Sequence, residues 1–109
     1  MFGMKGMGDI MKLMGQREKI AENMEQAKIR ARNRNVMGAS GGGLVKVIAN
    51  GLGDIIAVEF DPEALKDAES LGPLVVAASN IAVAKSKEVL AEELRTAMGG
   101  IDLPPGLLS

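Results

Sequence analysis

The chain has 109 residues, enough for one domain with a modest core, and its net charge of −1 by itself says nothing about nucleic acid. It contains no Cys and no His, which excludes disulfides, thiolate metal sites, the commonest general base and the commonest metal ligand. No apolar run reaches the ~18 residues of a membrane span. We therefore expect a single cytoplasmic domain over residues 1–109, with no metal, cofactor, small-molecule substrate or membrane contact.

The N-terminal third predicts one long helix. Residues 1–8 carry three glycines and are expected to be flexible, and Asp9 is a plausible helix N-cap. After it, apolar residues recur with 3-4 spacing along a seam interrupted by Arg17: Ile10, Leu13, Ile20, Met24, Ala27 and Ala31. A helix over 9–32 would be about 36 Å long, whereas a compact domain of this size has a radius of gyration of about 13 Å. We therefore expect the helix to project from the body as an arm.

The middle of the chain predicts three short strands. An edge strand is expected over 36–40, a second over 44–50 with Val45, Val47 and Ala49 on one face, and a third over 55–60. An Asn50-Gly51 turn joins the last two strands, and Asp61-Pro62 ends the sheet before a single helical turn over 62–66.

The last helix is expected to begin between Ser70 and Pro73, because proline is tolerated in the first helical turn. Residues 74–84 are apolar on every side, so this half should be buried all round, and one small sheet cannot cover it. A two-fold partner is the simplest cover, and the candidate interface residues are Val75, Val76, Ala78, Ile81 and Ala82. The second half is amphipathic and should pack against the first helix, before Gly99-Gly100 ends it and 101–109 forms an extended tail.

The resulting order is α-β-β-β-α, an α+β fold with two long helices and a three-stranded antiparallel sheet. Five segments carry a resemblance to a known family: the start Met1-Phe2-Gly3, the glycine run and strand Gly41–Val47, the Asn50-Gly51 turn, Asp61-Pro62 and the tail Leu103–Gly106. Their order closely resembles the YbaB/EbfC family of bacterial nucleoid-associated DNA-binding proteins. This resemblance covers nearly the whole chain. It implies a homodimer whose paired helices protrude like tweezers, and duplex DNA held by these helices.

Charge is divided unequally along the chain. Residues 1–50 hold nine basic and four acidic residues, a net of +5, whereas residues 51–109 hold four basic and ten acidic residues, a net of −6. Such a division suggests a polyanion-facing surface, although a solvated helix face gives the same pattern. The densest basic run, 28–34, also suits the C-terminal end of a helix dipole. The candidate DNA-binding residues are Lys12, Arg17, Lys19, Lys28, Arg30, Arg32, Arg34, Lys85, Lys87 and Arg95.

No enzymatic site is expected. The carboxylates at Asp61 and Glu63, or at Glu92 and Glu93, are interpreted as ordinary surface charges, and the serines have no His to activate them. The triglycine lacks the Gly-Lys-Ser/Thr sequence of a phosphate loop and precedes a strand.

Two functions remain open at this point. One is a nucleoid-associated homodimer that binds duplex DNA with low sequence specificity through cationic helical arms, with a role in nucleoid organisation and gene regulation. The other is a protein–protein interaction module that uses the heptad arms and the methionine-rich tips (Met4, Met7, Met11 and Met14) and binds little DNA.

Overall fold

Two long helices flank a small sheet in the computed structural model, which describes residues 2–99 but not the side chains of 2–10, 12 and 13. The elements are α1 (Phe2–Arg32), β1 (Asn35–Ser40), β2 (Val45–Asn50), β3 (Ile55–Phe60), the short 3-10 helix η1 (Ala64–Lys66) and α2 (Ala68–Ala97). The predicted order α-β-β-β-α is therefore confirmed. The tail expected over 101–109 lies outside the described residues.

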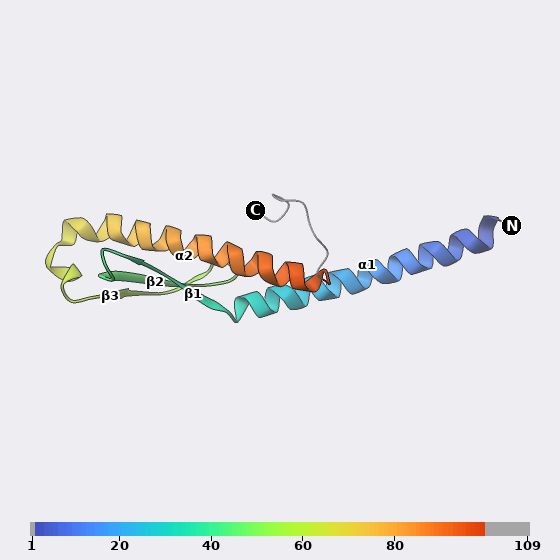
Figure 1. Cartoon of the computed structure of the whole chain (residues 1–109), viewed down its shortest axis with the longest axis horizontal. Helices are drawn as coiled ribbons and strands as arrows, with labels where there is room; N and C mark the ends of the chain where they lie inside the picture. The colour runs from blue at the N-terminus through green and yellow to red at the C-terminus, as the bar shows by residue number, and fades with distance from the viewer. Residues whose placement is uncertain (1, 100–109) are drawn as a thin grey trace.

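The sheet is antiparallel, with strand order β1-β2-β3, and α2 crosses β1 and β2 but leaves β3 largely uncovered (Figure 1). Its register pairs Gly38 with Val47 and Val47 with Val58, so these residues share one face of the sheet. A bulge near Ile48 and Ala49 shifts the register at the start of β3. The face turned to α2 is therefore apolar, as the alternation in β2 predicts.

Small residues allow α2 to lie directly on β1. Ala78 and Ala82 are fully buried, and a Cβ added to Gly38 would lie 2.6 Å from the backbone nitrogen of Ala82. The rest of the core consists of buried residues of β2 and η1: Val45, Val47, Ala49 and Ala64. Since close packing requires glycine at 38, the sequence here sets the distance between helix and sheet.

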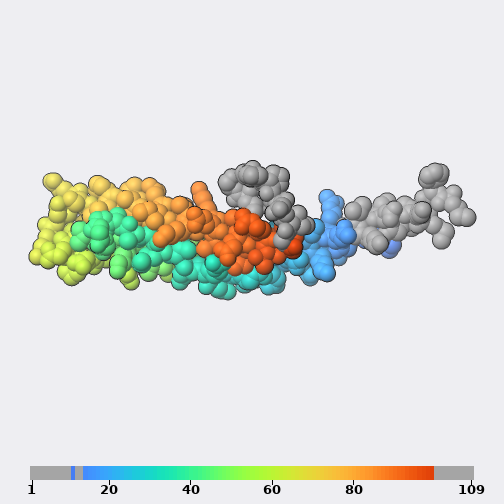
Figure 2. Space-filling view, viewed as in Figure 1, coloured from blue at the N-terminus to red at the C-terminus, as the bar shows by residue number. Residues whose placement is uncertain are grey.

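The first helix is longer than predicted, which makes the expected N-cap at Asp9 wrong. It begins at Phe2, because the three early glycines weaken a helix without ending it and no proline interrupts the segment. Ala27 and Ala31 are fully buried against α2, whereas Ile20 is exposed. Figure 1 shows that α2 ends beside the middle of α1, so the remaining part of α1 extends alone as the expected arm. The space-filling view in Figure 2 shows the slender outline that results, and the molecule measures 79 × 24 × 19 Å.

The second helix also starts earlier than predicted, at Ala68, so Pro73 lies in its second turn. As expected, the sheet alone does not cover residues 74–84 on all sides: Val76 is 59% exposed and Ile81 is 41% exposed in the single protomer. The sheet covers one side of α2, and the opposite side faces solvent. Among the described helices, none combines the length and hydropathy that a bilayer span requires.

Candidate nucleic-acid interface

The base of the arm is held by a cluster of ion pairs between α1 and α2. Glu93 accepts a hydrogen bond from Arg30 Nε at 2.8 Å on one carboxylate oxygen and from Arg34 Nη1 at 2.9 Å on the other. Arg34 also lies 3.5 Å from a carboxylate oxygen of Glu92. We call Arg30, Arg34 and Glu93 the arm-base clamp. The two acids were interpreted from the sequence as ordinary surface charges, and the structure instead brings them to two of the candidate DNA-binding arginines.

The clamp changes the protonation equilibria of its members. Hydrogen bonds from Arg30 and then Arg34 lower the pKa of Glu93, because both donors stabilise the carboxylate. The hydrogen bond to Glu93 likewise raises the pKa of Arg34, with smaller contributions from Glu92. The Glu93 side chain is only 13% exposed, so two charge-assisted hydrogen bonds satisfy a mostly covered carboxylate.

Four other candidate cations on α1 are exposed and make no ion pair with any side chain that the structure describes: Arg17, Lys19, Lys28 and Arg32. A helix turns by 100° per residue, which places Lys28 about 20° and Arg32 about 60° around α1 from Arg17. We call these three residues the cationic stripe. Lys19 lies about 200° from Arg17 and therefore belongs to another side of the helix. Nothing is described of the Lys12 side chain.

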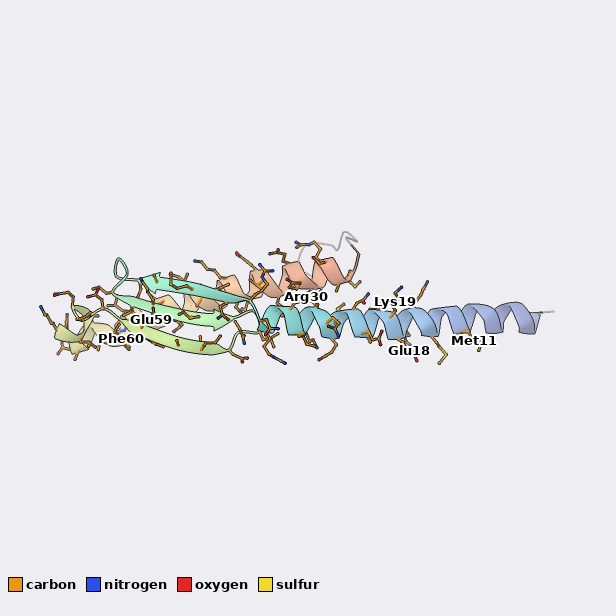
Figure 3. All side chains as sticks on the ribbon, turned by 90° about the horizontal axis from the view of Figure 1, so that it is seen from below. Met11, Glu18, Lys19, Arg30, Glu59 and Phe60 are labelled. Atoms are coloured by element: carbon orange, nitrogen blue, oxygen red, sulfur yellow. The ribbon has the colours of Figure 1, made fainter. Side chains whose placement is uncertain are left out.

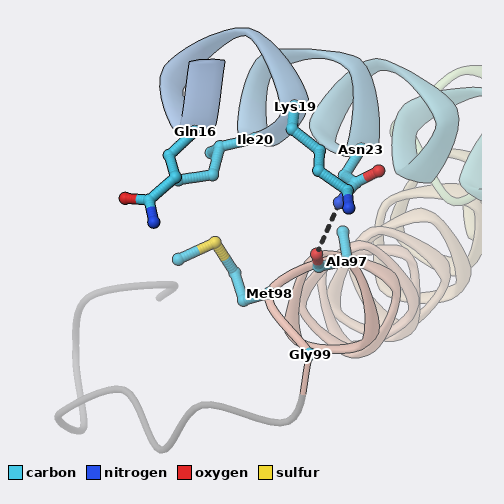
Figure 4. A pocket seen from close by; sticks show the side chains of 7 residues that line it. All are labelled: Gln16, Lys19, Ile20, Asn23, Ala97, Met98 and Gly99. Atoms are coloured by element: carbon cyan, nitrogen blue, oxygen red, sulfur yellow. Dashed lines mark hydrogen bonds between the residues drawn. The ribbon is translucent and has the colours of Figure 1, made fainter. Parts of the chain in front are cut away.

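Lys19 lines a groove between α1 and the end of α2. The groove has a volume of about 410 Å³, and its other walls include Gln16, Ile20, Asn23 and Met98 (Figure 4). Asn23 Nδ2 donates to the carbonyl of Ala97 across it at 3.5 Å, a long hydrogen bond. In Figure 3, Lys19 and its acidic neighbour Glu18 leave α1 on different sides.

The groove and the cationic stripe lie on opposite sides of the molecule. Lys85 Nζ donates to the carbonyl of Met37 in β1 at 2.9 Å, so Lys85 marks the β1 side of α2. Thr96 follows Lys85 by 11 residues, about 20° around the helix, and adjoins Asn23 and Arg30 in a second hollow. That hollow therefore opens on the β1 side. Asn23 lines this hollow, and the cationic stripe lies on the opposite side of α1 from Asn23. The stripe therefore lies on the β3 side.

The basic candidates Lys87 and Arg95 on α2 lie apart from the cationic stripe. Lys87 and Arg95 are exposed, and they lie about 140° and about 220° around α2 from the buried Ala82, so they face away from the sheet. The ten sequence candidates thus fall into a clamped pair, a stripe on α1 and separate positions on α1 and α2.

An uncovered apolar surface lies on the same side as the stripe. Val58 and Phe60 share the sheet face of Val47 and Val45 but lie beyond the edge of α2, and they are 39% and 41% exposed. Ile55 at the start of β3 is also exposed, and so is Val76, which lies about 120° around α2 from Ala82. We call Ile55, Val58, Phe60 and Val76 the apolar β3 surface.

The candidate dimer-interface residues occupy three different environments in the protomer. Ala78 and Ala82 are fully buried against their own sheet, and Val75 is partly buried against the same core. Val76 belongs to the apolar β3 surface, whereas Ile81 lies on the β1 side near Gly38. The β3 residues of the apolar β3 surface were not among the sequence candidates.

Two of the polar groups considered for catalysis, Asp61 and Ser40, have structural partners. Asp61 Oδ1 accepts the N–H of Glu63 at 2.9 Å ahead of η1, and Ser40 Oγ donates to the carbonyl of Leu74 at 2.6 Å. Within the described part of the chain, no group of three or more acidic, His or Cys side chains is placed to hold a metal ion.

Comparison with known proteins agrees with this architecture. The model of the YbaB/EbfC DNA-binding family matches residues 7–101. A nucleoid-associated protein of Pelotomaculum thermopropionicum is 35% identical over 99 residues, covering 89% of this chain and 94% of the relative. A second nucleoid-associated protein, from Sulfurihydrogenibium sp., is 38% identical over 94 residues, covering 84% and 86%.

The fold has also been observed by crystallography. The crystal structure of an uncharacterised protein from Helicobacter pylori superposes with a TM-score of 0.66 at 24% identity, covering 83% of this chain and 94% of that one. At this identity the likeness concerns the fold. The family model and the two relatives each span most of the chain, and the chain therefore belongs to the YbaB/EbfC DNA-binding family.

Proposed function

We propose that this protein is a nucleoid-associated protein that binds duplex DNA with little sequence specificity through cationic arms of a homodimer. The observation that carries the proposal is the cationic stripe: Arg17, Lys28 and Arg32 are exposed, lie on one side of α1 and make no ion pair within the described structure. The family description and the names of the relatives support DNA as the ligand.

The mechanism is neutralisation of phosphates with release of counterions. The stripe spans 15 residues, about 22 Å along the helix axis, so its cations can reach several phosphates along a duplex. Phosphate contacts fix the position of a protein on DNA but carry no sequence information. The chain has two Phe and no Trp or Tyr, so stacking of bases on aromatic side chains contributes little. Binding is therefore directed at the backbone and responds strongly to salt.

A second copy of the chain completes the site in this proposal. The apolar β3 surface gathers four exposed apolar side chains on one side of the protomer, and exposed apolar surfaces mark protein–protein interfaces. An isologous contact across a two-fold axis covers it on both chains. Because the cationic stripe lies on the same side as this surface, the dimer turns both stripes toward the space between the two arms. DNA then lies between the arms, and its contact with α1 supports a role in nucleoid organisation and gene regulation in the cytoplasm.

The test is binding of the purified protein to fluorescently labelled duplexes, followed by anisotropy. Two 30-base-pair duplexes of unrelated sequence are compared at 50 mM and 200 mM salt. We expect similar affinities for both, and six phosphate contacts per dimer predict a loss of about 1,000-fold between the two salt concentrations. Absence of binding at 50 mM salt would contradict the proposal. The favoured function would then be the protein–protein interaction module, which the exposed Met11 and Met14 on the arm support.

A further inference from the structure

The groove between α1 and the end of α2 exposes mostly apolar surface (Figure 4). Ile20 on its α1 wall is 46% exposed, although this residue lies only about 20° around the helix from Ala27, which is fully buried. Met98 lines the wall that α2 contributes. The apolar face of α1 therefore continues past the point where α2 stops covering it, and a hollow of about 410 Å³ adjoins this face.

We propose that this groove receives the segment 101–104 of the same chain, which follows α2 in the sequence as Ile-Asp-Leu-Pro. The docked segment covers Ile20 and Met98 and supports α1 beyond the last turn of α2. This inference concerns the support of the arm, and it holds whether or not α1 binds DNA.

The point at which the chain leaves α2 favours this occupant. Gly99 lines the groove, and its φ of 71° is the left-handed conformation that ends a helix and changes the direction of the chain. Ile101 follows two residues later, so its Cα can lie no farther than about 7 Å from that of Gly99. A segment tethered this closely has a millimolar or higher effective concentration at the groove, so even a weak contact keeps it docked.

The sequence of the segment suits the chemistry of the groove. A residue that precedes proline is restricted to extended backbone, which favours that conformation for Leu103. In an extended segment Ile101 and Leu103 project to one side and Asp102 to the other. The two aliphatic side chains then meet the apolar walls, and Asp102 lies at the rim. Lys19 lies at this rim, about 100° around α1 from Ile20, and makes no ion pair with any side chain that the structure describes.

The direction of the segment follows from what already covers α1. Toward the base of the arm, α2 occupies the same face of α1, since Ala27 is fully buried there. The segment therefore runs outward, past Ile20 toward Gln16, which also lines the groove. The groove opens on the β1 side, whereas the apolar β3 surface lies on the other side. A second copy that pairs through the apolar β3 surface thus leaves the groove accessible to the chain's own segment.

The first experiment is disulfide trapping in the full chain, which has no Cys of its own. The test variant combines Gln16→Cys with Pro104→Cys, and it leaves Ile20 and the residues at 101–103 unchanged. The control combines Glu18→Cys with Pro104→Cys, because Glu18 is exposed about 200° around α1 from Gln16 and at nearly the same height. Oxidation in a glutathione buffer is followed by mass spectrometry, and a non-reducing gel separates disulfides within one chain from those between chains. We expect the test pair to close within one chain at least about tenfold faster than the control pair, because docking holds its two thiols together.

The second experiment measures amide hydrogen exchange along α1 without any cross-link. One full-chain variant carries Ile101→Ser and Leu103→Ser, and its control carries Leu107→Ser and Leu108→Ser, which removes as many aliphatic side chains outside the proposed segment. Exchange over residues 16–20 should be several-fold faster in the first variant than in the control or the unmodified protein, because loss of docking leaves this turn unsupported. Equal closure rates for the two cysteine pairs, faster closure between chains than within one chain, or equal exchange in the two serine variants would overturn the inference. None of these outcomes bears on the proposed function, which the duplex-binding experiment tests separately.

Discussion

The backbone N–H of Gly51 donates a hydrogen bond to the carbonyl of Ala31 at 2.8 Å, which joins the β2–β3 turn to the end of α1. The same N–H lies 3.0 Å from the carbonyl of Arg34. A Cβ added at Gly51 would lie 2.6 Å from the carbonyl oxygen of Ala31 and 2.7 Å from Cγ1 of Val89. Only glycine fits here, so this contact fixes where the arm leaves the body.

Replacing Gly51 with Ala is therefore expected to lower the free energy of unfolding by about 1–3 kcal/mol, the usual cost of forcing a group into a packed site. Urea unfolding followed by circular dichroism measures it. Gly15→Ala is the matched control, because nothing lies within 4 Å of an added Cβ there. Alanine in the exposed helix should raise stability by up to about 1 kcal/mol. Equal stability of Gly51→Ala and the unmodified protein would show that the turn can move away from α1.

Aspartate at two positions of α2 is expected to have different consequences. Ala82 is fully buried against the sheet, so Ala82→Asp places an unpaired charge in the core and should abolish cooperative unfolding. Val76 is 59% exposed in the protomer, so Val76→Asp should leave the chain folded. Circular dichroism melts separate the two results, and an unfolded Val76→Asp protein would mean that this residue is needed within the protomer itself.

The apolar β3 surface predicts the assembly. Light scattering of the unmodified protein at micromolar concentration should give about twice the chain mass of 11.4 kDa. Val58→Asp puts a charge at the proposed interface and should give a folded monomer, since a buried unpaired charge costs several kcal/mol. Met11→Asp, on the exposed arm, is the control and should stay dimeric. A monomeric unmodified protein, or a dimeric Val58→Asp protein, would place the interface elsewhere or remove it.

The clamp predicts a pH dependence of stability. The pKa of Glu93 is lowered in the folded protein, so folding favours the carboxylate. The carboxylate of Glu93 contributes fully to the free energy of unfolding above its unfolded pKa, near 4.5. This contribution is lost as the pH falls through the lower pKa of the folded protein. The stability difference between the unmodified protein and Glu93→Gln should therefore be constant from pH 7 to pH 6 and shrink below pH 4.5. Urea unfolding at several pH values measures it, and a constant difference down to pH 3 would contradict the clamp geometry.

Much of the fold could be predicted from local patterns. The alternation of Val45, Val47 and Ala49 and the Asn50-Gly51 turn placed β2 and β3 within one residue of their observed bounds. Helix starts were less accurate, because glycines before Asp9 and a proline at 73 only weaken a helix at those positions. Local sequence does not show how strongly neighbouring turns support a helix.

Less of the candidate site could be predicted from the sequence. The basic run 28–34 reads as one cluster, but Arg30 and Arg34 meet Glu93, which is about 60 residues distant in the chain. Helical periodicity alone would have separated Arg30 from Lys28 and Arg32, although it gives no sign of the partner acid. Likewise, Val58 and Phe60 look like core residues in sequence, and only the position of α2 over β1 and β2 shows that they are uncovered.

The central claim is that the cationic stripe, and not positive charge in general, binds DNA. Two triple variants lose the same charge: Arg17, Lys28 and Arg32 to Gln on α1, and Lys85, Lys87 and Arg95 to Gln on α2. The most direct measurement is the slope of log affinity against log salt for one duplex with both variants and the unmodified protein. The stripe variant should bind more weakly to all sequences and flatten the slope by up to about 5 per dimer, whereas the α2 variant should change it little. If the α2 variant flattens the slope as much as the stripe variant, or the stripe variant leaves it unchanged, the arm of α1 does not hold DNA as proposed.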